Sequence, residues 1–136
     1  MQERKQPETL RLRAVMPAIT ATDLQASLAW YRDVLGFIVA EEYKQEDRLM
    51  GVRLQAGSVQ LMLGQDDFAK GRDRQKGAGL RFFCTTAQDV DQLAAAIKER
   101  GGKLAHEPTD QPWGTRDFGI VDPDGFNISI STEPKG

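Results

Sequence analysis

The side chains best suited to chemistry gather between positions 113 and 131, near the end of the chain. Trp113 and Arg116 open this stretch. Residues 122–125 (DPDG) have the composition of a tight turn, because proline presets φ and glycine accepts the left-handed conformation. Residues 126–131 (FNISIS) then alternate apolar and polar, as in a strand with two different faces. If the polar face lines a cavity, its amide and hydroxyl groups decide what that cavity can bind.

The composition is that of an ordinary globular domain. The chain has 136 residues, of which 40% are hydrophobic and 28% charged, with a formal net charge of −2. This balance gives no electrostatic reason to expect nucleic acid or a membrane surface as partner. The single cysteine, Cys84, excludes an intrachain disulfide. Together with the lack of a hydrophobic signal core in the first residues, this leads us to expect a cytoplasmic protein.

The chain reads as a tandem duplication. Three kinds of landmark recur at nearly the same spacing: a helix-opening aspartate, a helix-closing glycine and a hairpin glycine. The pairs are Asp23 and Asp89, Gly36 and Gly101, and Gly57 and Gly125. Each half is therefore predicted to repeat one supersecondary unit.

Each half is predicted to contain a strand, a helix and three further strands. In the first half we expect strands at 12–20, 37–43, 48–56 and 58–63, and a helix between Asp23 and Gly36. In the second half we expect strands at 80–85, 103–106, 116–121 and 126–131, and a helix between Asp89 and Gly101. The resulting divisions are a flexible tail (1–11), a first module (12–64), a crossover loop (65–79) and a second module (80–132), all in one domain.

Residues 23–37 (DLQASLAWYRDVLGF) resemble the first-helix signature of the vicinal oxygen chelate superfamily. This superfamily includes glyoxalase I, extradiol dioxygenases, fosfomycin-resistance enzymes and bleomycin-resistance proteins. Residues 113–116 (WGTR) and 122–125 are similar to the bleomycin-resistance branch, and the resemblance covers about residues 12–132. It implies an α+β fold in which two βαβββ modules form an open, curved mixed sheet, an incomplete barrel around a cleft. It also implies a homodimer in which the partner builds or closes that cleft.

Enzymes of this superfamily hold a divalent metal through histidine and glutamate side chains on four strands. Carried over by position, these four slots are Met16, Met62, Phe82 (or Arg81 after a one-residue slip) and Ser129. None of these side chains offers the imidazole or carboxylate that such an ion needs. We therefore expect neither a metal ion nor another cofactor.

Other constellations for catalysis are weak. His106 is the only histidine, so one subunit cannot supply a two-histidine site. We expect it on the surface or at a sheet edge, far from the four slots. Cys84 is expected to be a small core residue without a base, and the carboxylates Asp66 and Asp67 to belong to a loop. The mixed-charge residues 72–76 are expected to be solvated.

Without a metal, the cleft would combine soft apolar groups with hydrogen-bonding ones. Trp113 is expected to stack on a ligand or to pack against Phe118 or a partner subunit. Arg116 is expected to pair with a ligand anion or with an acid such as Asp117 or Glu107. Phe68 is the candidate lid in the crossover loop, whose alternative role is merely to link the modules. The predicted ligand-binding residues are Met16, Gln60, Met62, Phe68, Arg81, Trp113, Arg116 and Ser129.

The resulting hypothesis is metal-independent binding of a small amphipathic or aromatic molecule by a dimer, with antibiotic sequestration as one form of it. The chief alternative is a lyase, isomerase or dioxygenase with an atypical site that uses Arg81, Arg116 or Ser129. A third is a regulatory or assembly module whose interior holds no ligand. The residue types at the four slots favour the first hypothesis and leave the ligand unnamed.

Overall fold

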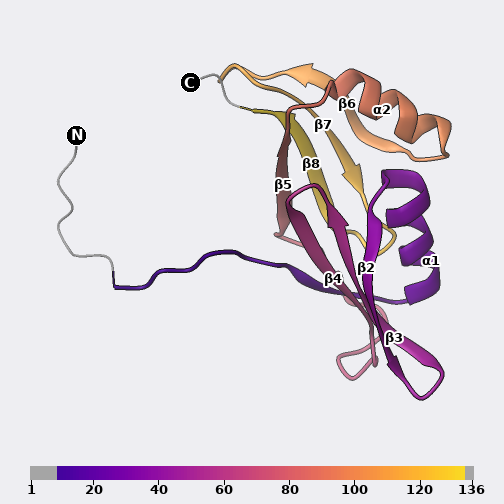
Figure 1. Cartoon of the computed structure of the whole chain (residues 1–136). Coiled ribbons are helices and arrows are strands. Elements are labelled where there is room, and N and C mark those ends of the chain that lie inside the picture. The colour runs from indigo at the N-terminus through magenta and orange to yellow at the C-terminus, as the bar shows by residue number, and fades with distance from the viewer. Residues whose placement is uncertain (1–8, 134–136) are drawn as a thin grey trace.

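The computed structural model describes residues 9–133; residues 1–8 of the predicted tail and residues 134–136 lie outside the described part. The first module contains β1 (Ala18–Ala21), α1 (Leu24–Ala29), the π-helix η1 (Trp30–Leu35), β2 (Ile38–Gln45), β3 (Arg48–Ala56) and β4 (Val59–Gln65). The second contains β5 (Arg81–Thr86), α2 (Val90–Glu99), β6 (Leu104–Asp110), β7 (Arg116–Val121) and β8 (Asn127–Thr132). The two modules lie side by side, with α1 and α2 on the same side of the molecule (Figure 1).

The two sheets have the same topology. Their strand orders are β1-β4-β3-β2 and β5-β8-β7-β6. In each sheet the first and last strands of the module pair in parallel, and the other neighbours are antiparallel. The predicted α+β fold of two βαβββ modules is confirmed.

The helices begin and end where the capping residues predict. The Asp23 carboxylate accepts a hydrogen bond from the Ala26 amide, and Asp89 caps α2 in the same way. Gly36 and Gly101 end the helical segments with φ values of 102° and 94°, the left-handed conformation that glycine adopts without strain. Among the described residues, no helix is long and apolar enough to cross a membrane.

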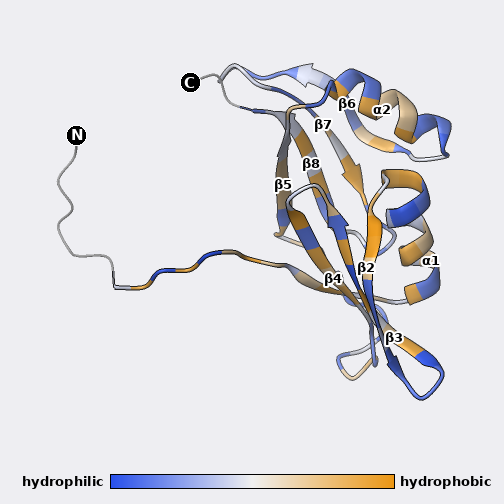
Figure 2. Ribbon diagram, in the orientation of Figure 1, coloured by the Kyte–Doolittle hydropathy of each residue, from blue (hydrophilic) through white to orange (hydrophobic). Residues whose placement is uncertain are grey.

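The core lies between the helices and one face of each sheet. In Figure 2 hydrophilic and hydrophobic residues alternate along several strands, so that each sheet has one apolar face. The apolar side chains of both modules, among them Leu28, Leu54, Ile97 and Phe118, form one buried cluster. The opposite face of each sheet carries polar and partly exposed side chains. We call this second face of the two sheets the open face.

Polar contacts join the two modules at the edge of this core. The Tyr31 hydroxyl donates to Asp122 Oδ2 over 2.8 Å, in a fully buried position. The Lys76 ammonium lies 2.8 Å from Asp66 and 3.6 Å from Asp124, and all three side chains are at least 92% buried. Asp124 also accepts hydrogen bonds from Thr22. The crossover loop is thus fixed between the modules, and Lys76 corrects the expectation that residues 72–76 are all solvated.

Three elements differ from the prediction. The first strand spans Ala18–Ala21 rather than 12–20: its pairing with β4 begins only after Pro17, which has no N–H to donate to the ladder. Residues 9–17 extend away from the sheets (Figure 1). The predicted first helix changes from an α-helix to a π-helix at Trp30, which the apolar spacing does not distinguish. Strand β6 continues to Asp110, past Pro108, with irregular pairing to β7.

Replacing Tyr31 with phenylalanine removes one donor from a buried carboxylate. Burial raises the pKa of Asp122, and the hydrogen bonds from Phe126, Tyr31 and Asp124 oppose that rise. We expect Tyr31→Phe to lower the free energy of unfolding by about 1–3 kcal/mol, the cost of an unmade buried hydrogen bond. Denaturant unfolding monitored by circular dichroism measures it. Tyr43→Phe, at a partly exposed tyrosine, is the matched control, and an equal effect of both changes contradicts the prediction.

The Lys76 contact also predicts a pH dependence. The hydrogen bond from Lys76, followed by that from the Phe68 amide, lowers the pKa of Asp66 from 3.8 to about 2. A lowered pKa stabilises the fold above pH 3.8, and that stabilisation is lost as the pH falls toward 2. We expect Lys76→Met to lower the melting temperature above pH 4, with a difference from the parent protein that narrows between pH 4 and pH 2. Lys70→Met, a change at an exposed residue of the same loop, should show no pH-dependent difference in melting temperature from the parent protein.

Candidate functional site

The open face gathers four of the eight residues predicted to bind ligand: Gln60, Met62, Arg81 and Ser129. On β4, Gln60 and Met62 alternate with the buried Leu61 and Leu63 and therefore point to the open face. Met16 precedes β1 and is 41% exposed, so it lies outside the strand that was expected to hold it. In the second sheet, Arg81 and Ser129 also belong to the open face. Trp113, Arg116 and Phe68 lie elsewhere.

Arg81 and Ser129 contact one another directly. Arg81 Nη1 donates to Ser129 Oγ over 2.7 Å, from β5 to the neighbouring β8. Ser129 is almost completely buried, whereas Arg81 is exposed. Of the two alternatives for this slot, Arg81 lies on the same face as Ser129, whereas Phe82 stacks against Phe126 on the core side. Two of the four slots thus form a hydrogen-bonded arginine and serine.

His106 and Asp117 form a second polar pair on the same face. The His106 Nε2 and Asp117 Oδ1 atoms are 3.0 Å apart, and Gln111 Nε2 donates to the same oxygen over 2.9 Å. The imidazole lies above Gly119, where an added Cβ would come within 2.6 Å of its Nδ1. A neutral imidazole that donates from Nε2 keeps a lone pair on Nδ1.

The position of His106 corrects the sequence prediction. It lies on an edge strand, as expected, but it is not far from the slots. The strand register runs from Phe83 to Ser129, Gly119 and His106 in one row across the sheet. Sequence spacing missed this row because it depends on an irregular β6–β7 pairing. The glycine at 119, between two buried apolar residues, was the available signal.

The other three predicted residues lie away from the open face. Arg116 forms ion pairs with Asp91 and Asp110, both at short distance, rather than with the expected Asp117 or Glu107. Trp113 lies in the turn before β7 and is 66% exposed. Phe68 is half-buried, with the Arg72 guanidinium 4.0 Å from its ring centre. None of the three contacts the Arg81–Ser129 pair.

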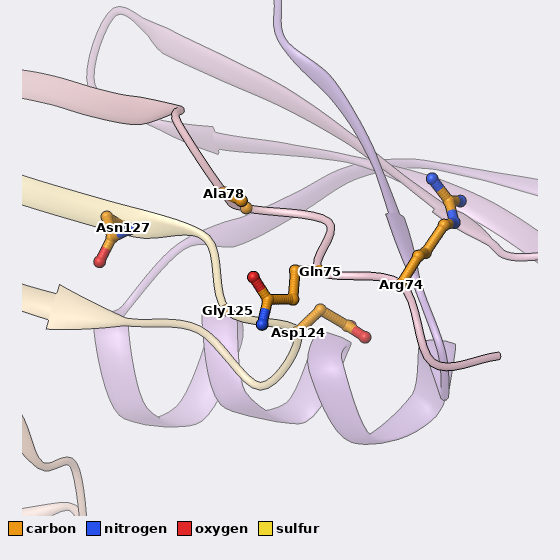
Figure 3. Close-up of a pocket in the computed structure, with 7 residues that line it drawn as sticks. Arg74, Gln75, Ala78, Asp124, Gly125 and Asn127 are labelled. Carbon is orange, nitrogen blue, oxygen red and sulfur yellow. The ribbon is translucent and has the colours of Figure 1, made fainter.

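Two hollows lie outside the open-face row. A hollow of about 320 Å³ lies where the crossover loop meets the DPDG turn, with Asn127 at one end and Arg74 at the other (Figure 3). A groove of about 690 Å³ runs between the modules and is lined mainly by apolar side chains, including Phe37, Val59 and Ile130. Cys84 lines this groove, and burial raises the pKa of its thiol. Cys84 is therefore a partly buried thiol at the junction, with its ionised form disfavoured.

The residues that could hold a metal ion are dispersed. Over residues 9–133, no group of three or more histidine, cysteine, aspartate or glutamate side chains is arranged to hold one. Asp117, the carboxylate that contacts His106, is already shared by His106 and Gln111. The described donor set therefore does not fit the metal centre of the chelate enzymes.

Paired βαβββ modules, with helices on one face and a polar row on the other, define the class of fold. A family model described as the Glyoxalase/Bleomycin resistance protein/Dioxygenase superfamily matches residues 13–130, and the chain belongs to this superfamily. Members of the superfamily are often dimeric and bind small molecules.

Individual relatives are distant. The chain is 26% identical over 132 residues to the bleomycin resistance protein of Geobacillus stearothermophilus, covering 88% of this chain and 96% of that protein. It is 30% identical over 117 residues to the uncharacterized protein YaeR of Escherichia coli K12, covering 83% and 90%. The crystal structure of TioX from Micromonospora sp. ML1 superposes with a TM-score of 0.72 at 18% identity, covering 88% and 98%. The last likeness concerns the fold alone.

Adding a methyl group at Gly119 should displace the imidazole from Asp117. We expect Gly119→Ala to break the 3.0 Å contact and to lower stability by about 1 kcal/mol, the net value of one hydrogen bond. Because the chain has one histidine, the NMR signals of its imidazole report the change without ambiguity. Gly64→Ala is the control, since a Cβ there meets only an ordinary contact at 3.8 Å. Unchanged imidazole signals in Gly119→Ala would contradict this placement.

Proposed function

We propose that this chain binds a small amphipathic or aromatic molecule without a metal ion, in a cleft that a second copy of the chain completes. The observation that carries the proposal is the 2.7 Å hydrogen bond between Arg81 and Ser129. At two of the positions that the family resemblance assigns to metal ligands, this chain has a hydrogen-bonding cation and a hydroxyl. Such groups orient an organic ligand directly.

The apolar part of the site supports the same proposal. Phe83 is 54% exposed on the open face, and Met62 is partly exposed on the open face of the other sheet. Exposed aromatic and thioether surface beside a few polar groups is typical of small-molecule sites. In one copy of the chain this surface faces solvent, so a second copy is the proposed cover. Sequestration of an antibiotic is the specific form suggested by the relative named bleomycin resistance protein.

Isothermal titration against glycopeptide and aromatic antibiotics tests the proposal, with native mass spectrometry of the untreated protein to report oligomer size and bound compounds. We expect one or more compounds to bind dimeric protein equally well before and after treatment with a chelator. Met62→Lys, which places a charge on the apolar part of the face, should weaken binding at least tenfold. Binding that is lost on chelation and restored by a divalent ion contradicts metal-independent binding. If no compound of the panel binds, the binding function itself is contradicted.

The His106–Asp117 pair favours a second candidate, an isomerase or lyase. An imidazole that is oriented by a carboxylate is the arrangement of a general base. Incubating each bound compound with the protein in deuterium oxide separates the two candidates. Carbon-bound deuterium detected by mass spectrometry, and its loss in His106→Gln, supports an enzyme; a ligand returned unlabelled supports binding alone.

A further inference from the structure

We propose that the ligand of the open face is an aromatic oxyanion, and that Arg81 binds its charged group. This inference rests on the proposed binding function and names the ligand class. It follows from the pairing of the charges around Arg81, from the groups beside it on the sheet, and from the exposed ring of Phe83.

Arg81 lacks an acidic partner in the described chain, as do Arg72, which lies over the Phe68 ring, and Arg100, which donates to the Val34 carbonyl. Ion pairs hold Arg32, Arg53, Arg74 and Arg116. Over the described residues, Arg81 has the Ser129 hydroxyl as its hydrogen-bond partner and no carboxylate within 4.0 Å. A guanidinium has five N–H donors, so most of them remain available on the exposed side. Arg81 therefore presents an uncompensated positive charge.

The neighbouring acids are engaged elsewhere. Asp117 lies on the same face and is held by His106 and Gln111. Asp124, in the turn before β8, is held by Thr22 and Lys76. The residue paired with Arg81 across the strands is Asn127, a neutral amide. A cationic ligand would thus meet an arginine and no free carboxylate, whereas an anion would meet a ready donor.

Ser129 fixes the orientation of the guanidinium. Its hydroxyl is buried in the central part of the sheet and holds Nη1, which restricts an otherwise flexible side chain. A restricted planar fork matches the two oxygens of a carboxylate, or two oxygens of a phosphate, through parallel hydrogen bonds. The geometry thus favours a group with paired oxygens over a single hydroxyl.

The exposed ring of Phe83 indicates that the ligand carries an aromatic group. It lies two residues after Arg81 on β5, so both side chains point to the same face. Its ring is 54% exposed, although aromatic rings are among the side chains that gain most from burial. A ligand ring attached to the bound anion would cover it. The row continues to His106, two strands from Ser129 and about 10 Å between backbones, so a two-ring compound spans the distance.

The test compares 2-naphthoate, its methyl ester and 2-naphthyl phosphate by isothermal titration against the full chain. We expect naphthoate to bind at least tenfold more tightly than the ester, and its affinity to fall as salt is added. Arg81→Gln should remove this preference and leave the ester unchanged. Arg48→Gln, the same loss of charge at an exposed residue of the β2–β3 hairpin, is the matched control. Melting temperatures confirm that each variant folds, and Arg81→Lys, which keeps the charge but not the fork, should retain only part of the preference.

The outcomes separate this inference from the proposed function. Ester binding as tight as acid binding, or an equal loss in Arg81→Gln and Arg48→Gln, overturns the anion site while binding itself stands. Tighter binding of the phosphate than of the carboxylate supports the oxyanion site and assigns it to phosphate esters. If none of the three naphthyl compounds binds while a compound of the antibiotic panel does, the anion site alone is overturned. If neither the naphthyl compounds nor the antibiotics bind, both proposals are overturned.

Discussion

The placement of the two modules depends on one buried charge. The Lys76 ammonium lies between Asp66 from the end of the first sheet and Asp124 from the last turn of the second. A buried charge is tolerated only when its partners stay in place, and removing Lys76 would leave Asp66 with Arg74 alone and take away the ion pair of Asp124. The next residue, Gly77, passes against the Gly125 carbonyl so closely that no Cβ fits. The crossover loop is therefore a structural part of the module junction as well as a connection.

This junction decides which surface remains for binding. It closes the helix-covered faces of both sheets into one core, with Tyr31 and Asp122 at its polar edge. Successive side chains of a strand point to opposite faces of the sheet, so the strand side chains that do not enter the core point to the open face. Exposed apolar groups such as Phe83 and Val121 are the result. The core of the chain and the exposure of its candidate site are thus two consequences of the same packing.

The sequence predicted the fold from its local signals and missed what depends on long-range pairing. Asp23, Asp89 and the glycines at 36, 57 and 101 mark turns and caps that are set within a few residues, and the structure has them there. Alternation also placed Gln60 and Ser129 on the open face. Strand β1 is shorter than predicted because its pairing with β4, far along the chain, begins only at Ala18. The burial of Lys76 and the contact of His106 with Asp117 likewise arise from strands and loops that meet only in the folded chain.

The four slots suggest how the superfamily scaffold changes its chemistry without changing its fold. In the chelate enzymes the centre of the sheet supplies lone pairs that bind a cation. In this chain the same region supplies N–H and O–H donors, one of them a permanently charged guanidinium. Both arrangements place positive charge at the sheet: the first through an ion held by its ligands, the second through a side chain. A fixed arginine binds oxyanions over the whole pH range in which the ligand is ionised, but it offers no open coordination position for activating water. Selection of a ligand by its charge and shape is therefore the chemistry that we propose for these residues.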